Sequence, residues 1–223
     1  MENCQKILIV AATRQEILPL LEFLIGNLEQ QDDFSFRKDG KQIDVLITGV
    51  GMMATAYHLG SQLSIKKYDL VLNIGIAGTF RRDWALGTVV QIVSEELSQL
   101  GAEKADSSFD DVFELGLLGA NDFPFNGGKL VNTTIIPDVP KAKGVTVSTT
   151  SGSNNTIKNI VDRYQPDIES MESAAFFYAC LQKGLKFMAF RAISNYVEPR
   201  NKDNWKIGLA VQRVNDFIIS FLF

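Results

Sequence analysis

The sequence is poor in the residues on which several kinds of functional site depend. It holds one histidine, His58, and two cysteines, Cys4 and Cys180, among 223 residues. These are too few for a disulfide scaffold or a zinc site of histidines and cysteines, and a reduced compartment is the simpler interpretation. A single histidine also argues against a Ser-His-Asp triad. These absences argue against a metal site, and nothing in the sequence implies an organic cofactor.

An excess of positive charge and long hydrophobic runs are also lacking. Lys and Arg number 22 against 26 Asp and Glu, which gives a net charge of −4. A mildly acidic surface repels phosphate backbones, so we expect no nucleic acid as a partner. The apolar stretches 7–12 and 217–223 are far shorter than the ~20 residues of a membrane-spanning helix, and the N-terminus lacks the features of a signal peptide. We expect a cytoplasmic protein with no membrane partner.

The patterns that are present indicate one α/β domain over residues 1–223. Hydrophobic residues make up 46% of the chain and charged residues 22%, and no repeat or linker divides it. Short apolar strands alternate with helices, which is typical of an α/β layer fold with a mixed or parallel sheet. The region 95–142 is expected to hold loops and short elements. We predict strands over 6–12, 43–48, 69–74, 88–93, 144–148 and 187–193, an extended segment over 166–171, and helices over 17–28, 53–66, 155–164, 173–183 and 205–222.

Two polar features follow predicted strands at the carboxyl edge of the sheet. Thr13 and Glu16 have the spacing of a capping box, and the Glu16 carboxylate could accept a proton from a water molecule there. The alternative is a helix-start acid favoured by the helix dipole. Gly75 and Gly78 end another strand, where their backbone N–H groups could approach a ligand. The alternative for the two glycines is only a tight turn.

Two further segments combine charge with apolar surroundings. Segment 167–172 holds three acids just before a helix, and Glu172 could accept two hydrogen bonds from a sugar diol or be a solvated helix-start acid. Arg191 lies inside an otherwise apolar strand, where an arginine requires a partner. Asn195 has both a donor and an acceptor, which suits an amide-like edge of a ligand. An ion pair and a turn cap are the alternative, but the clustering of Arg191, Ser194 and Asn195 favours a functional site.

One motif resembles a dinucleotide-binding loop but has the wrong context. Residues 49–54 match G-x-G-x-x-A, and Asp69 lies twenty residues after Gly49. The motif follows the second predicted strand rather than the first, and Asp69 lies at the start of a strand rather than at its end. A tight strand-to-helix turn is the favoured interpretation. His58, in the following helix, is expected to be a packed or surface residue rather than a catalytic base.

Four blocks in register resemble the nucleoside phosphorylase/nucleosidase superfamily, specifically its methylthioadenosine/S-adenosylhomocysteine nucleosidases. They are IVAATRQEI, NIGIAG, SMESAA and RAISN, and the resemblance covers about residues 6–215. Residues 191–200 together with 205–207 are more similar still to futalosine hydrolases, which release hypoxanthine from futalosine in a menaquinone pathway. The resemblance implies a three-layer α/β/α sandwich around a mixed, barrel-like sheet. It also implies a homodimer or larger homo-oligomer, for which the apolar helix over 52–63 could supply an interface.

Carried over residue by residue, the resemblance assigns roles to the polar features described above. Glu16 becomes the base that activates the attacking water, and Arg191 helps to orient that water and the carboxylate. Asn195 falls where adenine-specific nucleosidases carry an aspartate, and Ile76 falls where they often carry a serine. The base-stacking loop is expected near residues 148–154. Substrate contacts are expected at Gly78, Met171, Glu172 and Ser194, with Glu172 holding the 2′ and 3′ hydroxyls of the ribose.

The carboxamide of Asn195 predicts which purine base is preferred. Its NH2 group can donate to O6 of a 6-oxopurine while its oxygen accepts from N7–H. An unmatched edge would leave buried polar groups unpaired, at a cost of about 1–3 kcal/mol per group. We therefore predict a small-molecule purine nucleoside as substrate, with hypoxanthine or guanine preferred over adenine.

Three rival functions are compatible with the sequence. A phosphate-dependent phosphorylase would need a Gly-x-Pro-x-Arg-type loop, whereas residues 12–16 contain no glycine or proline, and Glu16 would repel a phosphate dianion; Arg14 keeps this function open. The second rival is a methylthioadenosine-type nucleosidase, and the third is a non-catalytic nucleoside-binding protein.

The 5′ substituent of a nucleoside could be held by Phe80, Arg81, Arg82 and Trp84. The alternative is that these residues form only a surface loop.

Overall fold

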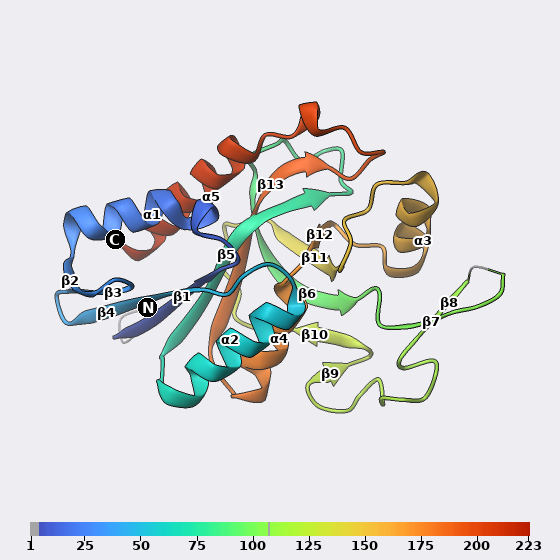
Figure 1. Cartoon of the computed structure of the whole chain (residues 1–223), viewed down its shortest axis with the longest axis horizontal. Coiled ribbons are helices and arrows are strands. Elements are labelled where there is room, and N and C mark those ends of the chain that lie inside the picture. Colours follow the sequence, from blue (N-terminus) through green and yellow to red (C-terminus); the bar gives the residue numbers. More distant parts are fainter. Residues whose placement is uncertain (1–4, 107) are drawn as a thin grey trace.

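The computed structural model describes residues 5–106 and 108–223, in which a mixed sheet is covered by helices on both faces (Figure 1). Cys4 lies outside the described residues. The helices are α1 (Arg14–Asn27), α2 (Met52–Ile65), α3 (Asn154–Tyr164), α4 (Ser173–Gln182) and α5 (Ile207–Leu222), with a short 3-10 helix at Lys202–Asn204. Among these residues, no helix is long and apolar enough to cross a bilayer.

Five strands of the sheet close on themselves and form the barrel-like centre. They are β5 (Leu70–Thr79), β12 (Ile168–Ser170), β11 (Lys141–Thr146), β6 (Val89–Leu97) and β13 (Phe187–Tyr196). The ring closes because β13 pairs in parallel with β5 and antiparallel with β6. The β12 strand pairs in parallel with β11 and antiparallel with β5, which makes the sheet mixed. The expected α/β/α sandwich with a mixed, barrel-like sheet is confirmed.

The sheet extends from the barrel on two sides. On one side, β1 (Lys6–Ala11) and β4 (Lys41–Ile47) continue in parallel from β5, and a hairpin of β2 (Glu29–Asp32) and β3 (Ser35–Lys38) follows. On the other side, β10 (Lys129–Val131) and β9 (Phe125–Asn126) follow β6. The β2–β3 hairpin was not expected, because β2 is the polar and fully exposed segment EQQD. It has no hydrophobic alternation, and pairing along β3 forms it.

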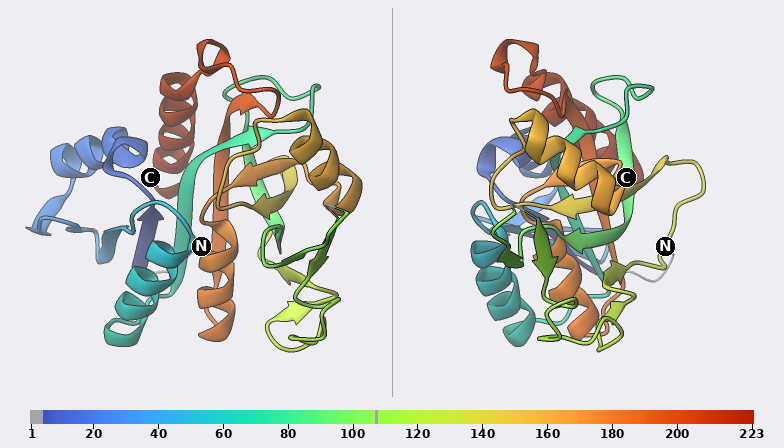
Figure 2. Two further views of the ribbon diagram at one scale, coloured as in Figure 1. Left: turned by 45° about the vertical axis from the view of Figure 1, so that its right-hand side comes forward. Right: turned by 90° about the vertical axis from the view of Figure 1, so that its right-hand side faces the viewer.

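Two hydrophobic clusters lie on the two faces of the sheet. In one, α1 and α5 pack together against β1, β5 and β13; in the other, α2 and α4 pack together on the opposite face (Figures 1 and 2). The apolar run of β1 is buried from Ile7 to Ala11, as expected for a strand covered on both sides. Six of the ten residues of α4 are buried, among them Ser173, Ala174 and Ala175, whose small side chains let the helix lie close to the sheet.

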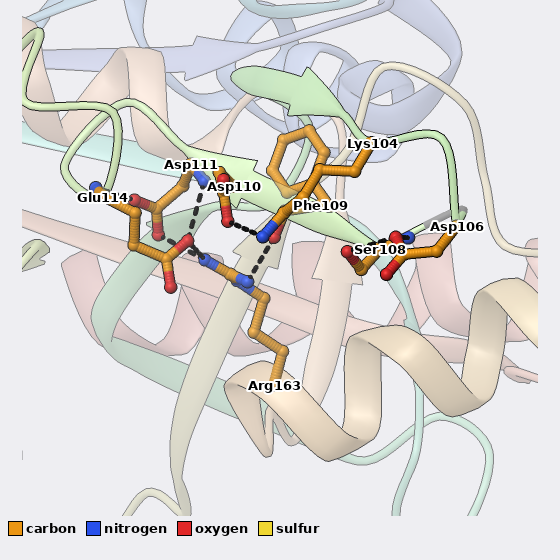
Figure 3. A network of polar contacts seen from close by, with 8 residues as sticks. All are labelled: Lys104, Asp106, Ser108, Phe109, Asp110, Asp111, Glu114 and Arg163. Carbon is orange, nitrogen blue, oxygen red and sulfur yellow. Dashed lines mark hydrogen bonds and ion pairs between the residues drawn. The ribbon is translucent and has the colours of Figure 1, made fainter.

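The irregular region between β6 and β11 is joined to α3 by a polar network (Figure 3). It contains a two-stranded sheet of β7 (Gly101–Glu103) and β8 (Phe109–Asp111). Arg163 of α3 donates to the Phe109 carbonyl at 2.8 Å and to Asp111 at 2.9 Å, and it also pairs with Glu114. The expectation of loops with short elements is confirmed for this region.

The glycines behave differently in the two glycine-containing segments. Gly49 and Gly51 have φ values of 85° and 92°, so the turn between β4 and α2 needs residues that tolerate a positive φ, as predicted. By contrast, β5 continues without a break to Thr79, and Gly75 and Gly78 lie within it. The tight-turn alternative for these two glycines is therefore wrong. They lie where side chains from neighbouring elements come close to the strand.

Candidate active site

A cavity of about 320 Å3 opens where β1, β5 and β13 end and α4 begins. Six of the seven predicted site residues lie in its wall: Glu16, Gly78, Met171, Glu172, Ser194 and Asn195. They come from four segments that are far apart in the sequence. Its size is within the range of small-molecule sites.

Glu16 belongs at once to the capping box of α1 and to the cavity wall. Its Oε2 accepts hydrogen bonds from the backbone N–H and the hydroxyl of Thr13, each at 3.0 Å. Its Oε1 accepts from the backbone N–H of Ile76 at 3.3 Å, which ties the carboxylate to β5. Burial raises the pKa of Glu16, and the positive charge of Arg191 opposes the rise. The result is a positioned carboxyl group with a higher proton affinity than an exposed glutamate has.

Gly75 leaves the space into which this carboxylate fits. A methyl group at Gly75 would lie 2.9 Å from Glu16 Oε1 and 3.5 Å from Arg191 Nε. Side chains at this position would push Glu16 and Arg191 away from the strand. The glycine is therefore required for close approach.

Arg191 lies behind the cavity wall and is 2% exposed. It donates to the Phe190 carbonyl at 2.9 Å, to Asn73 Oδ1 at 2.5 Å and to the Ser173 hydroxyl at 2.9 Å. In the described part of the chain it makes no direct ion pair, so the structural ion-pair alternative is wrong. Burial lowers the pKa of Arg191, and the charges of Glu172 and Glu16 at longer range oppose this. Its positive charge in turn opposes the rise in the pKa of Glu16.

The junction of β12 and α4 supplies Met171 and Glu172. Glu172 is the N-cap residue of α4 but makes no capping hydrogen bond with its side chain. Its Oε1 instead accepts from the backbone N–H of Gly51 at 2.9 Å. The glycine turn before α2 thus holds the carboxylate in the cavity wall, away from its own helix. This disagrees with the alternative of a solvated helix-start acid.

Ser194 and Asn195 lie at the end of β13, next to Gly78 of β5. The Ser194 hydroxyl lies 2.7 Å from Asn195 Oδ1, and Asn195 Nδ2 donates to the Tyr196 carbonyl at 3.1 Å. A methyl group at Gly78 would lie 3.1 Å from Asn195 Nδ2. Gly78 therefore makes room for the carboxamide at the cavity, which is a second close approach along β5.

Sequence analysis missed Glu169, which also lines the cavity. It is 5% exposed, its Oε1 accepts from the backbone N–H of Ser151 at 3.0 Å, and its Oε2 has no hydrogen-bond partner. Burial raises the pKa of Glu169, and the Ser151 side chain and the Ser151 backbone N–H both oppose the rise. The alternation of strand side chains was an available signal, because it places Glu169 on the same face as Met171.

The outer part of the cavity also differs from the expectation. Phe80 packs with Val145, Val147 and Ile160, and Arg81 lies over the Trp84 ring. Arg82 pairs with Glu198 at 2.9 Å. Among the described residues that line the cavity, Phe80, Arg81, Arg82 and Trp84 do not occur. Two lining residues, Arg200 and Trp205, instead bring a positive charge and an aromatic ring together, with the guanidinium 5.3 Å from the ring centroid.

The remaining candidates lie as follows. Thr150 and Ser151, from the expected base-stacking loop, line the cavity, as does Ile76. His58 is exposed on α2 beside Tyr57 and lies outside the cavity wall, in agreement with the surface interpretation. Within residues 5–106 and 108–223, no group of three or more His, Cys, Asp or Glu side chains is arranged to hold a metal ion.

Comparison with known proteins gives matches over most of the chain. Residues 6–222 match the phosphorylase superfamily. A futalosine hydrolase from Streptomyces coelicolor is 27% identical over 193 residues, covering 78% of this chain and 76% of the relative. A 5′-methylthioadenosine/S-adenosylhomocysteine nucleosidase from Haemophilus influenzae is 26% identical over 203 residues, covering 85% of this chain and 86% of the relative. The native futalosine hydrolase structure from Helicobacter pylori has a TM-score of 0.79 at 16% identity, covers 100% and 99% of the two chains, and supports the fold.

Proposed function

The chain belongs to the phosphorylase superfamily, and on this premise we propose that it hydrolyses the N-glycosidic bond of a 6-oxopurine nucleoside, with futalosine as the substrate. Hypoxanthine and the base-free sugar derivative would be the products, and menaquinone synthesis the pathway. The observation that carries the proposal is the convergence of Glu16, Glu172 and Asn195 on one cavity. These side chains supply a base, a diol acceptor and a reader of the purine edge.

In the proposed reaction, water attacks C1′ as the bond from C1′ to N9 breaks. The sugar acquires oxocarbenium character, Glu16 accepts the proton of the water, and the purine leaves with a proton from solvent on N7. The hydrogen bonds from Thr13 and Ile76 fix the Glu16 carboxylate before substrate arrives, so little reorganisation is needed. The negative charge of Glu172 near the ribose hydroxyls favours the positive charge that develops on the sugar.

Base recognition follows from the carboxamide of Asn195. Its NH2 group donates to O6, and its oxygen accepts from N7–H as charge develops on the leaving base. Adenine presents a donor at position 6, which would face the NH2 donor. This favours hypoxanthine over adenine and separates the proposal from a methylthioadenosine-type nucleosidase, the second candidate function.

Water rather than phosphate is the proposed nucleophile. Arg14, which left the phosphorylase alternative open, is exposed and lies outside the cavity wall. In the proposed complex the Glu16 carboxylate would lie next to C1′, where its charge would repel a phosphate dianion. Phosphate-independent release of base is the expected result.

A carboxylate-bearing aromatic substituent at C5′ fits the outer part of the cavity. Arg200 and Trp205 line it together, and the guanidinium is also within 3.3 Å of the Thr150 hydroxyl. Arginine binds carboxylates in a planar, two-pronged geometry, and an aromatic ring packs against another ring. This pair supports futalosine rather than a nucleoside with a small 5′ group.

The test is a panel of futalosine, its 6-amino analogue, inosine and methylthioadenosine, each assayed for free base with and without phosphate. Fastest release of hypoxanthine from futalosine, independent of phosphate, is expected. Glu16→Gln keeps the size of the side chain but removes the base, and kcat should fall by about 10²–10⁴-fold. Turnover that requires phosphate would refute hydrolysis, and binding without turnover in the wild type would support a non-catalytic binding protein.

We also propose a homodimer formed through α2 and α4. Met53, Tyr57 and Ile65 of α2 are 88%, 70% and 77% exposed, which is unusual for large apolar side chains. Beside them, a mostly apolar cavity of about 630 Å3 lies between these two helices and the β9–β10 region. A second copy covering this surface would bury it.

A further inference from the structure

Glu169 and Asn195 face the same point of the cavity from the two sides of β5. In the strand register Glu169 of β12 is opposite Gly78, and Asn195 of β13 is opposite Gly78 on the other edge. A methyl group at Gly78 would lie 3.1 Å from Asn195 Nδ2 and 3.6 Å from Glu169 Cγ. Both side chains therefore extend on the same side of the sheet, over the glycine. A base edge read by Asn195 also comes within reach of Glu169.

The hydrogen bonding of Glu169 is incomplete. Oε1 accepts from the Ser151 backbone N–H, whereas Oε2 and the nearby Ser151 hydroxyl are both buried and have no partner. A buried carboxylate oxygen without a hydrogen bond is destabilising, and a donor supplied by a ligand would relieve that cost. The same arrangement uses up the Ser151 N–H, a cavity-lining donor that could otherwise bind an acceptor on a base.

As a result, the cavity wall beside Asn195 offers a hydrogen-bond acceptor rather than a donor. The backbone donor is occupied, and a free carboxylate acceptor takes its place. Next to O6 of hypoxanthine lies N1–H, which is a donor, whereas N1 of adenine is an acceptor. We propose that Glu169 accepts a hydrogen bond from N1–H of the 6-oxopurine and is a second specificity-determining residue. The inference rests on the proposed nucleosidase function and adds to it a residue that selects the base.

Glu95 offers a control that distinguishes base recognition by Glu169 from the general effect of changing a buried glutamate. Glu95 is also a fully buried glutamate with one unpartnered oxygen, and its Oε2 accepts from Thr146 at 2.8 Å. It does not belong to the described residues that line the cavity. Glu95→Gln is therefore a control for the same change at Glu169, since both replace one buried carboxyl group with an amide.

The effect of Glu169→Gln can be worked out from its neighbours. The Ser151 N–H keeps the amide oxygen in the place of Oε1, so the amide NH2 takes the place of Oε2. This NH2 opposes N1–H of hypoxanthine and matches N1 of adenine. The ratio of kcat/KM for futalosine over its 6-amino analogue should fall by about 5- to 150-fold, equivalent to about 1–3 kcal/mol at 1.36 kcal/mol per tenfold.

The experiment measures that ratio for the wild type, Glu169→Gln and Glu95→Gln, with folding checked by circular dichroism. A fall confined to Glu169→Gln is expected. An unchanged ratio in Glu169→Gln, or an equal fall in Glu95→Gln, would overturn the inference. If Glu169→Gln does not fold, product inhibition of the wild type decides: hypoxanthine should inhibit at least about 5-fold more strongly than 1-methylhypoxanthine, which lacks N1–H. Equal inhibition would overturn the inference.

Failure of this inference can be told from failure of the proposed function. Absence of base release from every nucleoside by the wild type would refute the function itself. Release of hypoxanthine by the wild type, together with an unchanged ratio in Glu169→Gln, would refute only the role of Glu169.

Discussion

Replacement of Asn195 by aspartate should move base preference toward adenine. Asn195 Nδ2 lies 3.1 Å from the Tyr196 carbonyl and donates to it, and Oδ1 lies 2.7 Å from the Ser194 hydroxyl. In Asn195→Asp an oxygen would replace Nδ2 and face that carbonyl oxygen. Two acceptors at this distance repel each other, so the pKa of the introduced carboxyl should be raised. A protonated carboxyl could donate to N7 of adenine while its other oxygen accepts from the 6-amino group.

The magnitude follows from the hydrogen bonds that change partners. For a hypoxanthine substrate, the donor to O6 is lost, which costs about 1–3 kcal/mol or about 5- to 150-fold in kcat/KM. For an adenine substrate the edge becomes matched, but N1 still faces the carboxylate of Glu169. The gain for adenine should therefore be smaller than the loss for hypoxanthine. Asn195→Asp combined with Glu169→Gln should reverse the preference further than either change alone.

The assay is chromatographic measurement of free base at initial rate, with futalosine and its 6-amino analogue as substrates. Thermal melting of both proteins serves as the folding control. An equal loss of activity toward both substrates would mean that Asn195 contributes to rate but does not read the base. A ratio that does not move in a folded, active Asn195→Asp protein would refute the reasoning on specificity.

Three further predictions concern the acid–base group, the strand beneath it and the assembly. Burial raises the pKa of Glu16, and the ionised carboxylate is the base, so kcat should be retained at higher pH and lost as pH falls through this raised pKa. Because the positive charge of Arg191 lowers the pKa of Glu16, Arg191→Met should move this acidic limb of the pH–kcat profile to higher pH. An unmoved limb would contradict an electrostatic effect of Arg191 on Glu16. Gly75→Ala would place a methyl group 2.9 Å from Glu16 Oε1 and should lower kcat by about 10²-fold, because it displaces the base. A kcat near the wild-type value would contradict this prediction. Met53→Lys should convert the proposed dimer to a monomer in light scattering, whereas a persistent dimer would place the interface elsewhere.

Local sequence patterns determined much of the secondary structure and one part of the site. The apolar run of β1 and the capping box of Thr13 and Glu16 are complete within adjacent residues, so both could be predicted. The glycines before α2 have the positive φ values that their spacing predicted. The polar β2 segment could not be recognised, because its pairing with β3 is what makes it a strand.

The site was only partly accessible from the sequence. Glu16, Glu172 and Asn195 were identified because each lies at the end of a strand or the start of a helix, and resemblance to a family grouped them. Glu169 was missed, because its importance depends on an unpaired oxygen, which is a property of its surroundings. Phe80 and Arg82 have a suitable composition for a 5′ site, but Phe80 packs on a hydrophobic cluster and Arg82 pairs with Glu198, and neither lines the cavity.

By itself, the sequence determined where the helices and the apolar strands form, since periodicity, capping and turn residues act over a few neighbouring positions. Only the tertiary structure decided that β13 closes the barrel against both β5 and β6, and that closure brings Asn195 and Glu169 to opposite edges of Gly78. It also decided that Gly75 and Gly78 are spaces within a strand rather than turn residues. The physical reason is that these contacts join segments that are far apart in the sequence, such as Gly78 and Asn195, and their proximity depends on packing of the whole sheet.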